Sequence, residues 1–100
     1  MAAYQARNSI KAVQWYPDDK QRFERIKVLI ESNSGLGWRV NKDDILGSII
    51  IVRNCLNQRV LQISPYDYLV EGKRNSLFVV RPEMFELFYE KMSDTVYQKK

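Results

Sequence analysis

The residues best suited to recognition are aromatic and basic side chains in neighbouring predicted loops. Tyr66 and Tyr68 flank Asp67, and Lys73 and Arg74 follow at the tip of the next predicted turn. An exposed loop that carries tyrosine and arginine has the composition of a protein-binding hot spot. The sequence therefore predicts a partner-binding site on these loops. In the alternative interpretation, Tyr68 packs inward and only Tyr66 is exposed.

A second, smaller candidate for partner binding is Trp38 with Arg39. The two residues follow Gly37 at the start of a short predicted strand. They combine the same two interface-forming residue types, an aromatic ring and a guanidinium group.

The residue types present give little support for a catalytic site. The chain has no histidine and a single cysteine, Cys55, so it lacks the usual zinc ligands and a Cys–His nucleophile. No glycine-rich phosphate loop occurs. The acidic pair Asp18–Asp19 is explained by a helix N-terminus and the pair Asp43–Asp44 by a turn. We expect no enzyme activity, no cofactor and no metal site.

The net charge of +4 and the pI near 9.3 raise the alternative of a nucleic-acid or nucleotide ligand. A dedicated phosphate-backbone binder concentrates Lys and Arg on one face, and no dense basic run occurs here. Scattered charges are more often a solvated surface. The nucleic-acid hypothesis requires the basic residues to converge on one face of the fold: Arg39, Arg53, Arg59, Lys73 and Arg74.

The elements that must position these residues form an α+β pattern. Strands are predicted over 10–16, 37–40, 48–53, 59–63, 68–70 and 77–80, and helices over 19–32 and 82–92. In the first strand, Ile10, Ala12 and Gln14 are expected on one face and Lys11, Val13 and Trp15 on the other. The prediction is a small antiparallel, curved, half-barrel-like sheet of about five to six short strands, packed by two helices.

The 100 residues fit a single domain, with a core over about 4–92 and a polar C-terminal tail over 93–100. The longest apolar run, Ile49 to Val52, is far shorter than the roughly 20 residues that cross a membrane. The first eight residues lack the apolar run of a signal peptide. The lone cysteine fits a reducing compartment, so we expect a cytoplasmic protein that does not bind membranes.

Three segments in this order resemble the small phage and prophage proteins called PGDYG proteins. They read Ala12-Val13-Gln14-Trp15, Ser64 to Val70, and Pro82 to Tyr89, and the resemblance spans roughly residues 4–92. Tyr66 stands where the family motif has its first glycine, and residues 73–76 replace the Gly-Glu that usually follows. The resemblance implies a bacteriophage origin and a location in the host bacterial cytoplasm, and it assigns no activity.

These observations favour a phage-type accessory protein that docks on a host protein and inhibits it by steric occlusion, for example a defence factor. The second hypothesis is the nucleic-acid or nucleotide ligand. The third is self-association, because small antiparallel sheets expose edges that can pair across a two-fold axis.

Overall fold

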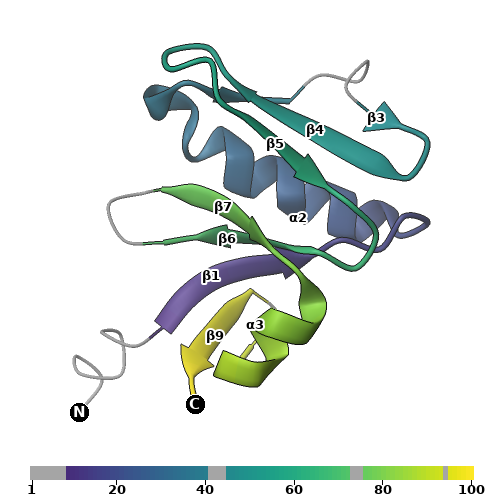
Figure 1. Cartoon of the computed structure of the whole chain (residues 1–100), viewed down its shortest axis with the longest axis vertical. Helices are drawn as coiled ribbons and strands as arrows, with labels where there is room; N and C mark the ends of the chain where they lie inside the picture. Colours follow the sequence, from purple (N-terminus) through teal and green to yellow (C-terminus); the bar gives the residue numbers. More distant parts are fainter. Residues whose placement is uncertain (1–8, 41–44, 73–75, 94) are drawn as a thin grey trace.

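The computed structural model describes residues 9–40, 45–72, 76–93 and 95–100, and within them two α-helices pack against two antiparallel sheets (Figure 1). The fold class is α+β, as the sequence predicted. The strands predicted as one curved sheet divide into two sheets. Pro65 explains the break, because it lacks an N–H for a ladder and begins the turn that leads from one sheet into the other.

The larger sheet is built around the first strand. β1 (Ser9–Gln14) pairs with β6 along one side, with Ala12 opposite Val70, and with β9 along the other, with Lys11 opposite Val96. The full order is β7-β6-β1-β9-β8, in which β6 is Tyr68–Glu71, β7 is Leu77–Val80, β8 is Tyr89–Lys91 and β9 is Val96–Lys99.

The smaller sheet is built around β4 (Ile49–Asn54). β5 (Val60–Ile63) runs along one side of β4, and β2 (Trp38–Arg39) and β3 (Ile45–Leu46) pair with its two ends along the other. Alternate residues of β4 are buried, since side chains of a strand point to opposite faces.

Side chains from β1 enter two different cores. Val13 and Trp15 join Ile26 and Leu29 of helix α2 (Lys20–Glu31) in a core that both sheets line. Figure 1 shows α2 lying between the two sheets. Ala12, on the opposite face, packs in an aromatic core with Tyr68, Val70, Phe85 and Tyr97. The predicted division of β1 into two faces is confirmed for these residues.

Helix α2 begins and ends close to the predicted limits. Asp19 is its N-cap and accepts a hydrogen bond from the backbone N–H of Arg22 at 3.1 Å. A 3₁₀ turn, η1 (Ser34–Leu36), follows, and Gly37 after it adopts a left-handed conformation with φ 98°. Gly37 is required there for a second reason, because a Cβ would lie 2.5 Å from Asn54 Oδ1.

The C-terminal region differs most from its prediction. Helix α3 (Pro82–Phe88) is shorter than the predicted 82–92, and the chain continues directly into β8. The predicted polar tail over 93–100 contributes β9, which lies between β1 and β8. One side chain explains the difference: Tyr97 is buried against Phe85 and Tyr68, which draws an otherwise polar segment into the sheet.

Among the described residues, no helix is long and apolar enough to cross a membrane.

Candidate functional site

The turn between β5 and β6 carries an unusual backbone conformation. Asp67 N–H donates to Ser64 O at 3.0 Å, which closes a four-residue turn with Pro65 second and Tyr66 third. Tyr66 has φ 73°, in the left-handed region that favours glycine. A proline followed by a positive φ is the pattern of a type II turn, whose third residue is usually glycine.

Buried Asp67 fixes this turn. Its Oδ2 accepts from Ser64 N–H at 3.0 Å, and its Oδ1 forms an ion pair with Arg81 Nη1. The carboxylate therefore has a structural role. Its buried negative charge is paired with the Arg81 guanidinium and accepts a hydrogen bond from a backbone amide, as a buried carboxylate requires.

The end of β1 holds the same turn from the other side. Trp15 N–H donates to Asp67 O at 2.8 Å, and Tyr66 N–H donates to Trp15 O at 2.7 Å. Gln14 Nε2 adds a bond to Tyr66 O at 3.0 Å. Since the backbone on both sides of Tyr66 is tied to β1, its ring projects from a rigid base.

The Tyr66 ring meets a second exposed tyrosine. Tyr66 is 54% exposed and Tyr16 is 37% exposed, and their rings pack edge to face with centroids 5.5 Å apart. The guanidinium carbon of Arg22 lies 4.3 Å from the centroid of the Tyr16 ring, a cation–π distance. Arg22 also donates to Gln14 O at 3.2 Å. We call the surface formed by Tyr16 and Tyr66 the tyrosine face.

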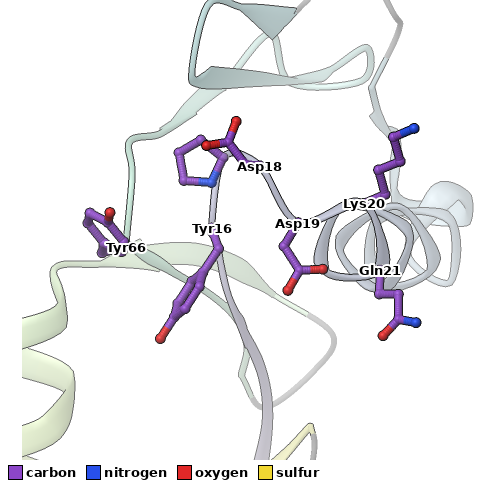
Figure 2. Close-up of a pocket in the computed structure, with 7 residues that line it drawn as sticks. Tyr16, Asp18, Asp19, Lys20, Gln21 and Tyr66 are labelled. Carbon is purple, nitrogen blue, oxygen red and sulfur yellow. The ribbon is translucent and has the colours of Figure 1, made fainter.

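An open cavity of about 450 Å³ adjoins the tyrosine face. Figure 2 shows the two tyrosine rings on one side of it and the first turn of α2, with Lys20 and Gln21, on the other. Its lining is completed by Pro17, Asp18 and Asp19. A hollow of this size beside two aromatic rings can receive a side chain or a short segment of a partner.

Tyr68 does not share this surface. It is buried, its ring stacks on Phe85 with centroids 4.0 Å apart, and its hydroxyl donates to Glu86 Oε2 at 3.1 Å. Burial, reinforced by this hydrogen bond, raises the pKa of the Tyr68 phenol above its ordinary value near 10. The phenol therefore stays protonated at neutral pH, where it serves as a donor that ties α3 to the sheet.

The remaining sequence-predicted site residues have different places. Trp38 is buried in the core around α2. Arg39 is exposed and donates to Ser34 O at 2.8 Å and to Trp38 O at 2.9 Å. Lys73 and Arg74 lie outside the described residues. The structure thus assigns Asp67, Tyr68 and Trp38 to the interior and leaves Tyr66 and Arg39 on the surface.

Sequence reasoning missed Tyr16 as a member of the site. It stands at the end of a predicted strand, before Pro17, and nothing in that local pattern indicates a partner 50 residues away in the sequence. The available signal was the pair of aromatic residues that each adjoin a proline, Tyr16-Pro17 and Pro65-Tyr66.

The described residues contain no group of three or more His, Cys, Asp or Glu side chains that could hold a metal ion. Cys55 is exposed on the β4–β5 hairpin.

A comparison with protein-family models finds no match, and comparisons with curated proteins and with solved structures find none either. The resemblance to PGDYG proteins stays a prediction from the sequence.

Proposed function

We propose that this chain is a binding module that docks on another protein through the tyrosine face. The observation that carries the proposal is Tyr66, an exposed aromatic residue held at a positive φ on a rigid turn. A non-glycine residue in this region costs about 1 kcal/mol or more in backbone strain. Because Tyr66 is 54% exposed, burial in the chain's own core recovers little of that cost.

The geometry around Tyr66 supports recognition rather than folding. A ring whose backbone is already fixed loses little conformational entropy when a partner covers it. Tyrosine beside arginine, here Tyr16 with Arg22, is a composition enriched at the centre of protein interfaces. The adjoining cavity supplies a concave surface for a side chain of the partner.

The partner class follows from the sequence resemblance. PGDYG-type phage proteins would act in the cytoplasm of a host bacterium, so we propose a host protein as the partner, with inhibition by steric occlusion. A host defence factor is one example of such a partner.

Tyr66→Gly separates binding from folding. Glycine adopts a positive φ without steric cost but loses more entropy on folding, so stability should change by less than about 1 kcal/mol. Gln58 has φ 62° on the exposed β4–β5 hairpin, so Gln58→Gly makes the same backbone change at a distant site.

In affinity capture from host bacterial lysate, we expect the wild type and Gln58→Gly to retain the same stoichiometric protein. Tyr66→Gly and Tyr16→Ala should lose it. Capture that is equal for all four chains, or no stoichiometric protein with the wild type, would contradict the proposal.

A nucleic-acid ligand is the second candidate, and one observation favours it: Arg39 of β2 lies directly opposite Arg53 of β4, and both are exposed. Of the three basic residues in this hypothesis that the structure describes, Arg39 and Arg53 are paired, whereas Arg59 precedes β5 opposite Asn54. Lys73 and Arg74 are outside the described residues. Binding through arginines should weaken steeply with salt. A gel shift at low salt that is reduced by Arg39→Gln would support this candidate, and no shift would dismiss it.

A further inference from the structure

Helix α3 presents an apolar surface on the side that faces away from the sheet. Met84, Leu87 and Phe88 are 50%, 66% and 51% exposed. They stand at positions i, i+3 and i+4, so they form one continuous stripe. We call these three residues the outer face of α3.

The chain's own core does not need this outer face. The inward contact of α3 comes from Phe85, which packs against Tyr68 and Tyr97. The apolar side chains of a surface helix normally face the core, with polar side chains on the exposed side. Exposed apolar patches on small proteins mark interaction sites.

The charged groups that flank α3 already have partners within the chain. Arg81 pairs with Asp67 and lies 3.6 Å from Glu83 Oε1. Glu86 accepts from the Tyr68 hydroxyl, and Lys100 Nζ donates to Glu86 O at 2.6 Å. The groups around the outer face therefore favour an apolar partner surface rather than one of a particular charge.

The sequence from 81 to 100 is also electrically neutral. It contains four basic residues (Arg81, Lys91, Lys99, Lys100) and four acidic ones (Glu83, Glu86, Glu90, Asp94), so the net charge of +4 belongs entirely to residues 1–80. Two copies that meet at α3 therefore bring together segments that carry no net charge.

We propose that the outer face of α3 is an interface between two copies of this chain. A two-fold axis places the same apolar stripe on both sides, which makes the contact self-complementary and closes it at a dimer. Met84 adapts its flexible side chain to the facing helix. The contact uses none of the residues of the tyrosine face, so it does not depend on the proposed docking function.

The dimer is weak and depends on concentration. Three side chains, each about half exposed, offer less than the roughly 800 Å² per partner of a standard stable interface. The association is also insensitive to sodium chloride, because paired charges at the rim contribute little to it.

Sedimentation equilibrium of the full chain tests the proposal, over about 10 µM to about 1 mM, where small interfaces assemble. The mass of the wild type should rise from that of one copy towards that of two, equally at low and high sodium chloride. Leu87→Glu, and independently Met84→Gln, should keep the mass of one copy throughout.

The matched control is Leu56→Glu, a charge placed on the β4–β5 hairpin at a leucine that is 71% exposed. This variant should dimerise as the wild type does, and circular dichroism should show that all variants are folded. A wild type that stays at the mass of one copy at about 1 mM overturns the proposal. So does a dimer that Leu87→Glu and Met84→Gln leave intact, or one that salt dissociates.

Discussion

Helices α2 and α3 pack on opposite faces of the same five-stranded sheet and differ in what they expose. α2 buries Ile26, Leu29 and Ile30 between two sheets, and charged side chains such as Glu24 and Glu31 occupy its exposed side. α3 buries Phe85 alone and exposes Met84, Leu87 and Phe88.

The difference shows which residues the fold itself explains. Every apolar position that α2 buries has a partner within the chain, so the pattern of α2 is a folding pattern. The outer face of α3 is exposed, so we attribute its pattern to the proposed contact with a second copy. Mutations in the two helices should therefore divide into effects on stability and effects on association.

The largest effect is expected in α2. Ile26→Ala leaves a cavity between the two sheets and should lower the free energy of unfolding by about 2–5 kcal/mol. Val28, on the same helix but 63% exposed, provides the control, since Val28→Ala should change stability by no more than about 0.5 kcal/mol. Urea denaturation measures both. Equal losses for the two variants would show that α2 is not the core helix.

The contact of α3 with the sheet should respond to alkaline pH, unlike the apolar contact of α2. The raised pKa of Tyr68 means that the folded state holds its proton more tightly than the unfolded state does. Stability should be full below the ordinary tyrosine pKa, near pH 10, and should fall as pH rises above it.

Tyr68→Phe should make stability fall less steeply above about pH 10, because the variant lacks the titrating phenol. It should also lower stability at neutral pH by about 1.5 kcal/mol, because the hydrogen bond to Glu86 is lost. Urea unfolding of both chains between pH 7 and pH 11 tests this. An unchanged slope above pH 10 in the variant would assign the alkaline loss to other groups.

The start of α2 is capped by a side chain, and the start of α3 is not. Asp19→Ala removes the carboxylate that accepts from Arg22 N–H, and it should cost about 1 kcal/mol of stability. Arg81 makes no such cap for α3, where Pro82 occupies the first turn instead. Thermal unfolding of Asp19→Ala and of Asp19→Asn, which keeps a capping oxygen, measures the difference. An equal loss in both variants would mean that charge rather than capping matters.

The smallest effect on stability should come from the outer face of α3. Leu87→Gln should alter the unfolding free energy of the single copy by no more than about 0.5 kcal/mol, because the side chain is largely exposed. Urea unfolding at low protein concentration measures this value without a contribution from the dimer. A loss comparable to that of Ile26→Ala would place Leu87 in the core.

Local patterns predicted the regular parts of the fold well. Alternation in β1, the apolar stripe of α2 and the capping role of Asp19 all appear in the structure, since each depends on residues within a few positions of one another. The same rules extended α3 too far, because Phe88, Tyr89 and Met92 continue a helical spacing while the chain turns into β8.

The candidate site was predicted in part. Tyr66 was proposed from the composition of its loop, and the structure adds the positive φ that sets it apart. The inward packing of Tyr68, left open as an alternative, is what the structure shows. Tyr16 was missed, because it joins the site through the pairing of the end of β1 with the Ser64–Asp67 turn, which local patterns do not show.

The sequence alone determined the α+β class, the two faces of β1 and the absence of histidine chemistry, since residue type and short-range spacing carry that information. Only the tertiary structure decided that the strands form two sheets, that the polar C-terminal segment pairs with β1, and that Tyr16 meets Tyr66. These depend on contacts between residues far apart in the chain. The packing of the whole core determines which of several compatible contacts forms. Phe85 is buried in that core, whereas Leu87 on the same helix is exposed.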